Sequence, residues 1–152
     1  MCRALDTLIY LRLYFLMKKL SRSKLIKKLD TIFSIYIRLR DCDKQWVVVC
    51  PLCWARIPWK KSQNMHFISR WVLKYRYDEN NCHAGCYRCN VILNWNYIKY
   101  TRWMQNKFWV EEVDRMINDK QIFKIRTPEV EEMIEEYVIK SRQLANQKHL
   151  SL

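Results

Sequence analysis

Two pairs of cysteines, each separated by two residues, carry the strongest chemical signal in this chain of 152 residues. They are Cys50 with Cys53 and Cys86 with Cys89. Four thiolates in two such pairs can complete a tetrahedral shell around one Zn²⁺. The spacing therefore predicts a structural zinc site that joins the two segments into one small core. The alternative is two unrelated pairs of reduced thiols.

The segment between and beside these pairs holds side chains that could act on a phosphodiester. They are His66, Asn81, His83 and Asn90. A histidine with a pKa near neutrality can take a proton from an attacking water. An amide oxygen can ligate a hard cation such as Mg²⁺, which stabilises the charge that develops on the phosphate. In a strongly basic chain, this combination points to nucleic-acid cleavage.

Charge is distributed unevenly along the chain, which has 28 Lys and Arg against 15 Asp and Glu and a net charge of +13. Residues 1–40 and residues 50–110 each hold ten basic and two acidic side chains, whereas residues 111–152 hold seven basic and nine acidic ones. A cationic front two-thirds is expected of a protein that binds a phosphate backbone. A basic surface that serves only solubility is the alternative.

The cysteine count and the N-terminal sequence bear on the compartment. Seven cysteines are an odd number, and no secretory signal is recognisable. The apolar run Leu5–Met17 is interrupted by Arg12 and is too short to cross a bilayer. We therefore expect a cytoplasmic protein that ligates metal and has no membrane partner. Cys2, Cys42 and Cys82 would be spare structural thiols.

The first predicted element is a basic amphipathic helix over residues 17–45. Its apolar positions follow helical spacing, and Lys and Arg occupy the opposite face. This helix could contact DNA, lie on an acidic membrane or cover a core; we favour DNA, with plain packing as the main alternative. Residues 1–16 would be a disordered lead or an upstream, mis-annotated start.

The remaining pattern predicts an α+β protein, with a zinc-stapled core over residues 46–108 and a helical segment over residues 109–152. Val47–Val49 and His66–Ile68 are typical of short strands, and the second cysteine pair opens a helix. Thr127 would be the N-cap of the last helix, with Pro128 at its first position. The helices expected in the C-terminal half are Tyr97–Phe108, Val110–Asn118 and Thr127 to about Asn146.

This order of strand, strand and helix around zinc resembles the ββα-metal nucleases. His66, Asn81 and Asn90, the last directly after Cys89, resemble the HNH endonuclease motif in its His-Asn-Asn form. Over about residues 18–140, the chain is similar to the NinG/Rap family of phage recombination endonucleases. The segments that carry this similarity are SIYIRLRD (34–41), CPLC (50–53), HFISR (66–70), RYDENNCHAGCYRCN (76–90), NYIKY (96–100) and EEVD (111–114).

The resemblance implies an HNH-like core and a structure-selective endonuclease that cuts branched recombination intermediates with Mg²⁺ or Mn²⁺. His66 would be the general base, and Asn90 would ligate the catalytic cation. Asn81 would orient His66 or join the metal shell. His83 would be a further ligand, a phosphate contact or a structural hydrogen-bonder. The predicted DNA contacts are Arg70, Arg76 and Arg88 in the core and Lys27, Lys28 and Arg38 on the basic helix.

The predicted metal shell departs from the HNH pattern at Met65, where many HNH sites carry an acidic residue or a histidine. NinG-like sequences usually have a small residue there, so the departure is partly shared. It leaves the cation short of protein ligands, and a carboxylate could come from Asp78 or Glu79.

Two competing functions remain open. A non-catalytic, zinc-dependent module would bind nucleic acid without cutting it. A membrane-surface protein would use its first forty residues as an anchor, which leaves the zinc site unexplained. A homodimer would suit symmetric cutting of a junction, but the sequence contains no recognisable interface.

The chain has one glycine, Gly85, and seven tryptophans, whereas average usage predicts roughly eleven glycines. A bulky residue in the left-handed region costs about 1–2 kcal/mol. We hypothesise that many or all of the tryptophans are UGA codons that the source organism reads as glycine. The alternative is a tryptophan-rich protein that stacks bases on these rings. Trp46, Trp54, Trp71, Trp95 and Trp109 stand where turn chemistry favours glycine, and Trp59 and Trp103 complete the set.

Overall fold

The structure is a computed structural model that describes residues 20–149. The predictions made for residues 1–16 and for Cys2 lie outside this range. The helices are α2 (Arg22–Asp41), α3 (Leu73–Arg76), α4 (Tyr97–Phe108), α5 (Val110–Asn118) and α6 (Thr127–Gln147), and the strands are β1 (Val47–Val49), β2 (Arg56–Pro58), β3 (Gln63–His66) and β4 (Cys82–Gly85). Three short turns of helix complete the chain: η1 (Trp59–Lys61), η2 (Arg88–Ile92) and η3 (Asn94–Asn96).

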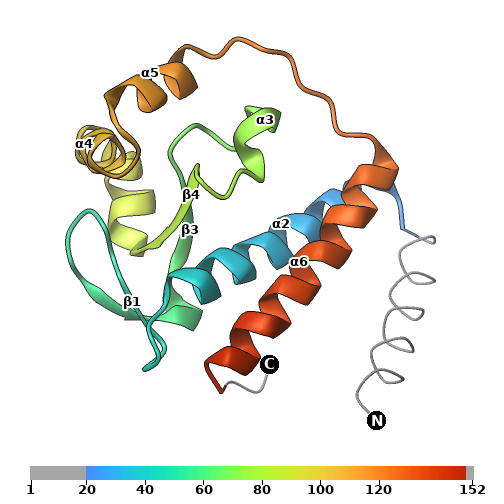
Figure 1. Ribbon diagram of the computed structural model, residues 1–152, viewed down its shortest axis with the longest axis horizontal. Helices are drawn as coiled ribbons and strands as arrows, with labels where there is room; N and C mark the ends of the chain where they lie inside the picture. Colours follow the sequence, from blue (N-terminus) through green and yellow to red (C-terminus); the bar gives the residue numbers. More distant parts are fainter. Residues whose placement is uncertain (1–19, 150–152) are drawn as a thin grey trace.

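Two small antiparallel sheets confirm the α+β class (Figure 1). β1 pairs with β2, and β3 pairs with β4 so that His66 lies opposite Cys82 and Met65 opposite His83. The prediction that the second strand covers His66–Ile68 was wrong, because the strand ends at His66. The side-chain Oδ1 of Asn81 accepts a hydrogen bond from the backbone N–H of Ile68 at 2.6 Å. This side-chain contact replaces the backbone pairing that would continue β3.

The basic helix α2 lies beside α6, the last helix, although the two are far apart in the sequence (Figure 1). Its apolar face is buried as the pattern predicts. Leu29 and Phe33 are almost fully buried, and the Phe33 ring centroid is 4.8 Å from that of Tyr137 on α6. Burying each such side chain stabilises the fold by about 1.5–3 kcal/mol. Packing is therefore one role of this helix, and its exposed Lys24 and Lys27 leave the opposite face basic.

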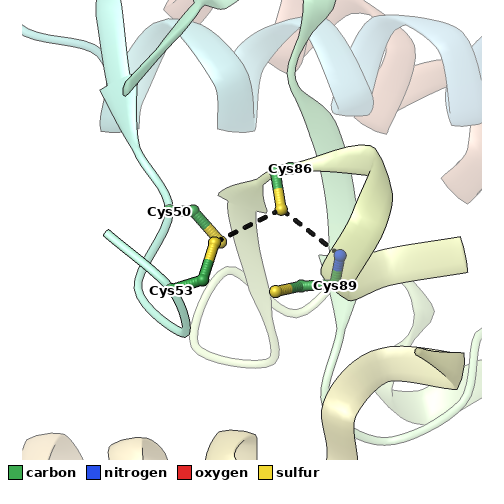
Figure 2. Close-up of side chains that lie close together, drawn as sticks. All are labelled: Cys50, Cys53, Cys86 and Cys89. Atoms are coloured by element: carbon green, nitrogen blue, oxygen red, sulfur yellow. Dashed lines mark hydrogen bonds between the residues drawn. The ribbon is translucent and has the colours of Figure 1, made fainter. Parts of the chain in front are cut away.

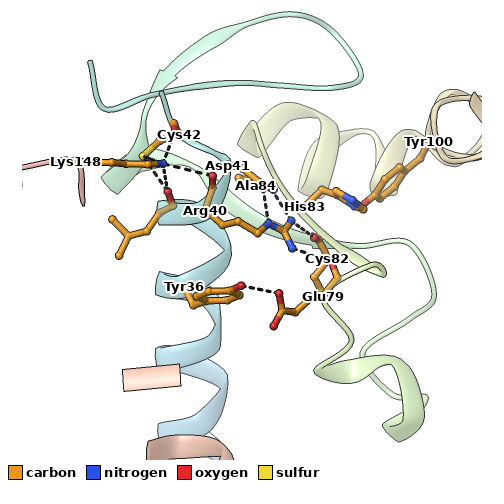
Figure 3. Close-up of polar contacts among 11 residues, drawn as sticks. Tyr36, Arg40, Asp41, Cys42, Glu79, Cys82, His83, Ala84, Tyr100 and Lys148 are labelled. Carbon is orange, nitrogen blue, oxygen red and sulfur yellow. Dashed lines mark hydrogen bonds and ion pairs between the residues drawn. The ribbon is translucent and has the colours of Figure 1, made fainter. Parts of the chain in front are cut away.

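The C-terminal end of α2 is fastened to β4 by charged side chains (Figure 3). Arg40 donates to the carbonyls of Glu79 and Cys82, both at 2.8 Å, and the Asp41 carboxylate accepts the N–H of Ala84 at 2.7 Å. Lys148 Nζ donates to the carbonyls of Leu39 and Arg40 in the last turn of α2, which lack partners within the helix, and to that of the C-cap residue Cys42. The basic helix is thus an integral part of the core.

The helices after the core follow the predicted pattern closely. α4 and α5 have the predicted bounds, and α6 begins at Thr127. The N-cap is Arg126 rather than Thr127, because Glu129 accepts hydrogen bonds from the backbone N–H and side chain of Arg126. Over residues 20–149, none of the helices combines the length and the apolar character that crossing a membrane requires.

Four of the five tryptophans expected in glycine-like turns have positive φ. The angles are 64° at Trp46, 63° at Trp54, 65° at Trp95 and 69° at Trp109. Trp109 combines its φ with ψ of 155°, a region that is essentially restricted to glycine. Trp71 also lies in a turn but is not among the positive-φ residues. The backbone therefore supports the glycine hypothesis at four positions.

The other two tryptophans use their rings in packing. Trp59 is buried, with the Arg38 guanidinium 5.8 Å from its ring centroid. Trp103 lies inside α4, with its ring centroid 4.5 Å from that of His83. These contacts favour a genuine aromatic residue at both positions. The gene sequence distinguishes the two hypotheses, because a genuine tryptophan is encoded by UGG rather than UGA.

We expect Trp109→Gly to raise the free energy of unfolding by about 1 kcal/mol, because glycine relieves backbone strain of about 1–3 kcal/mol at that angle. The Trp109 side chain is 80% exposed, so its loss removes little packing. Chemical denaturation measures the change. The matched control is Trp103→Gly, which should destabilise the protein because it loses packing and helix propensity. A lower stability of Trp109→Gly would contradict the strain argument.

Candidate functional site

The four predicted zinc ligands come together in space (Figure 2). Their Sγ atoms all lie within 4.8 Å of one another, and the Cys53 and Cys86 sulfurs are 3.6 Å apart. Zinc–sulfur bonds of about 2.3 Å in a tetrahedron place the sulfurs about 3.8 Å apart. The arrangement of Cys50, Cys53, Cys86 and Cys89 therefore fits one zinc ion, and four protein ligands make the site structural rather than catalytic.

Two tight segments present these sulfurs. The first pair lies in the turn between β1 and β2, where Trp54 N–H donates to the Cys50 carbonyl at 2.9 Å. The second pair follows β4, and the N–H of Cys89 donates to the sulfur of Cys86 at 3.3 Å. Gly85 directly precedes this pair. Its backbone lies so close to the Met65 side chain that a β-carbon at this position would collide with it.

The electrostatics of the cluster call for a cation. Burial raises the pKa of Cys50, and burial together with the sulfurs of Cys86 and Cys53 raises the pKa of Cys89 to about 12. Thiolates are the form that ligates metal. A dication among the four sulfurs would compensate the cost of holding them as thiolates in this buried place, and zinc matches the donor set.

A cleft of about 400 Å³ opens between α2 and the β3–β4 hairpin. Five residues of the predicted set line it together. Because α2 contributes to its wall, the cleft depends on the contacts that hold this helix against the sheet. The residues are His66, Asn90, Arg70, Arg76 and Arg38 from the predicted set, and Asp30 in addition.

His66 stands at the end of β3 with one ring nitrogen anchored. Its Nε2 lies 3.0 Å from the backbone carbonyl of Arg76. A carbonyl only accepts hydrogen bonds, so Nε2 carries the proton and Nδ1 is the basic nitrogen of the neutral ring. Burial lowers the pKa of His66, and the charges of Arg70 and Arg76 lower it further. At neutral pH the ring is therefore neutral, with its orientation fixed at Nε2 and with Nδ1 as the nitrogen that can accept a proton.

Asn90 lines the same cleft from η2, one residue after a zinc ligand. Its N–H donates to the carbonyl of Cys86 at 3.0 Å, so the cysteine cluster and the backbone turn fix its position together. An amide oxygen placed in this way could hold a hard cation beside His66, with waters completing its shell.

Asn81 and His83 are not among the residues that line the cleft. The Asn81 amide is fully buried and binds backbone on both sides of the loop that leaves His66: it accepts from Ile68 N–H and donates to the carbonyls of Ile68 and Tyr75. It orients the loop rather than the imidazole directly. His83 pairs with Met65, on the face of the hairpin opposite to His66.

His83 is enclosed by aromatic side chains of α4. Its Nδ1 is 3.0 Å from the hydroxyl of Tyr100, and it is only 2% exposed. Burial lowers the pKa of His83 to about 2, so the ring stays neutral. Among the residues described, its Nε2 has no hydrogen-bond partner. The geometry favours the structural hydrogen-bonding role that the sequence had left open.

The predicted phosphate contacts divide into two groups. Arg38, Arg70 and Arg76 line the cleft, whereas Arg88, Lys27 and Lys28 do not. Asp30 pairs with both Arg76, at 2.6 Å, and Arg70, at 3.6 Å, but Arg76 is 13% exposed whereas Arg70 is 54% exposed. Arg38 and Arg70 are therefore the arginines best placed to receive a phosphate, while the exposed Arg88 and Lys27 add to the general positive surface.

Neither Asp78 nor Glu79 lines the cleft. Glu79 accepts from Tyr36 and Lys140, which tie it to α2 and α6, and Asp78 accepts the N–H of Asn80. The carboxylate that does line the cleft is Asp30, which the sequence reasoning missed. One signal was available, since Asp30 is the only acidic residue within 18–40 of a strongly basic helix.

Asn64 was also missed. It lines the cleft two residues before His66, and within the described residues its buried Oδ1 has no hydrogen-bond partner. The alternation of side chains along β3 places it on the same face as His66.

We expect one zinc ion per chain, measured by elemental analysis, and loss of both zinc and folded structure in Cys50→Ser, because zinc binding supplies folding free energy of about 10 kcal/mol or more in such sites. The matched control is Cys42→Ser, which alters a buried thiol outside the cluster and should retain the metal. Retention of zinc by the Cys50→Ser variant would contradict the assignment.

Comparison with known proteins gives one result that covers most of the chain. The family model described as the bacteriophage lambda NinG protein matches residues 15–147. No curated protein and no solved structure matches the chain significantly. The family match agrees with the segments noted in the sequence, including the block that contains the second cysteine pair and Asn90. The chain belongs to the NinG family.

Proposed function

We propose that this protein is a metal-dependent, structure-selective endonuclease that cuts branched DNA during recombination. The observation that carries the proposal is the oriented His66, with Nδ1 as its basic nitrogen, in one cleft with Asn90 and two exposed or half-exposed arginines. The order of β3, β4 and η2, with the cysteine cluster beside them, supports an HNH-like ββα-metal core. Membership of the NinG family supports the recombination setting.

The chemistry follows from the residues in the cleft. Arg70 and Arg38 would bind the non-bridging oxygens of a phosphate, which places the phosphorus near His66. Nδ1 of His66 would take a proton from water as the water oxygen attacks phosphorus and the bond to the leaving oxygen breaks. A hard cation on Asn90 would supply charge stabilisation and assist the leaving oxygen.

DNA affinity would come mainly from charge. The net charge of +13 and the exposed basic face of α2 would give salt-sensitive binding that is independent of sequence. Selectivity for a branch would then come from the shape and deformability of the DNA. Two copies could cut a symmetric junction on both strands, but a monomer fits the same site chemistry.

A second candidate is a zinc-dependent module that binds nucleic acid without cutting it. Asp30 favours this alternative, because the carboxylate that lines the cleft is already engaged by Arg76. That engagement leaves Asn90 as the predicted cation ligand there. The two functions differ in one property, the metal-dependent cleavage of DNA.

The deciding experiment is cleavage of a labelled four-way junction beside a matched linear duplex. We expect Mg²⁺-dependent cutting of the junction, and a fall of about 10²–10⁴-fold in rate for His66→Ala, as for loss of a general base. His149→Ala is the control, because His149 is exposed on the C-terminal side of α6. Tight binding by a folded, zinc-loaded protein that does not cut would establish the binding module instead.

The pH dependence should report the state of His66. Only the neutral ring accepts a proton, and its lowered pKa keeps it neutral below the ordinary value of about 6.5. We expect kcat/KM to stay level as the pH falls to about 6.5 and to decline only below it. Arg70→Gln should move this decline to higher pH, because it removes a charge that lowers the pKa of His66. A shift to lower pH would contradict the electrostatic argument.

A further inference from the structure

We propose that Asp30 of α2 is a positioning residue for His66 and that it acts through Arg76. This inference rests on the proposed function, in which His66 is the base. It assigns a role in the site to the N-terminal basic helix, which the sequence connects with DNA contact, an acidic membrane surface or packing.

The first step is a clamp between α2 and the C-terminal end of α3. Asp30 Oδ1 accepts Nε–H of Arg76 at 2.8 Å, and Oδ2 accepts Nη2–H at 2.6 Å. The hydroxyl of Tyr77 also donates to Oδ1, at 2.9 Å. One carboxylate thus fixes two consecutive residues, in the two-point geometry that makes arginine–carboxylate pairs specific.

The second step runs from Arg76 to the imidazole. The carbonyl of Arg76 accepts the Nε2–H of His66 at 3.0 Å. This bond sets both the direction of the ring and its tautomer, because it requires the proton on Nε2. The position of the carbonyl therefore decides whether Nδ1 is the basic nitrogen.

The local chain explains why the carbonyl needs an outside clamp. Arg76 ends the four-residue helix α3, which lies in the long connection between β3 and β4. Asn81 fastens this connection at Ile68 and Tyr75, but the Arg76 carbonyl lies beyond those bonds. From β4, the Cys82 thiol makes only a long contact of 3.8 Å with this carbonyl, whereas Asp30 on α2 holds the Arg76 side chain at two points.

A purely structural ion pair is the competing explanation, and Asp119 provides a matched control for it. Asp119 accepts hydrogen bonds from Lys74 and from the hydroxyl of Tyr75, so it also clamps α3 through one basic residue and one tyrosine. It does not contact Arg76. Loss of either carboxylate should loosen α3, but only loss of Asp30 should release the Arg76 carbonyl.

The test is the ¹⁵N NMR spectrum of the His66 ring in zinc-loaded protein, where the protonated and unprotonated nitrogens have well-separated shifts. We expect the parent to show a single Nε2–H tautomer. Asp30→Asn should give a mixture of tautomers and reduce kcat about tenfold with little change in KM, as expected when a base is misaligned. Asp119→Asn should leave the ring signals unchanged.

Arg76→Met provides a second route, because it keeps the backbone carbonyl and removes the partner of Asp30. It should reproduce the mixed tautomers, and the double variant with Asp30→Asn should be no worse than either single variant. A single, unchanged tautomer in folded Asp30→Asn or Arg76→Met would overturn the inference. If the parent does not cut DNA, the proposed function fails, but the ring spectrum still decides whether Asp30 positions His66.

Discussion

The meeting of four cysteine sulfurs is the constraint on which the rest of the site depends. Cys50 and Cys53 come from the β1–β2 hairpin, and Cys86 and Cys89 from the end of β4. The sheets have two strands each, and a hairpin of that size is marginal by itself. A metal among the sulfurs would join the two hairpins and set the start of η2. Asn90, which directly follows, would then have a defined position opposite His66.

The second support is the helix pair outside the two hairpins. α2 buries its apolar face against α6, binds β4 through Arg40 and Asp41, and binds the end of α3 through Asp30. A helix that precedes both cysteine pairs in sequence thus forms one wall of the cleft. The match to the family model likewise spans residues 15–147 and so includes both helices as well as the cysteine-rich centre. The helices are part of the structural unit that carries the site.

The sequence predicts the features that depend on local interactions, and it fails for those that depend on contacts between distant parts of the chain. Local interactions determine the cysteine pairs, the bounds of α4 and α5 and the glycine-like turns, and the structure confirms these predictions. The turns are confirmed at Trp46, Trp54, Trp95 and Trp109. Asp30 and Arg76 meet across 46 residues, which no local pattern encodes. His83 lies on the face opposite to His66 because of the register of β3 and β4, and a shift of one residue would reverse that assignment.

The cleft also balances two opposing electrostatic demands. Cations attract a phosphate, but the same cations lower the pKa of a nearby imidazole and make it a weaker base. Asp30 pairs closely with Arg76, at 2.6 Å, and more loosely with the exposed Arg70, at 3.6 Å, so Arg70 is the easier of the two to transfer to an incoming phosphate. One partly buried carboxylate therefore limits the positive charge at the base while the surface beyond it stays cationic. Without Asp30, the positive charge of the cleft would be larger. It would strengthen the binding of a phosphate but lower the pKa of His66 further and so weaken it as a base.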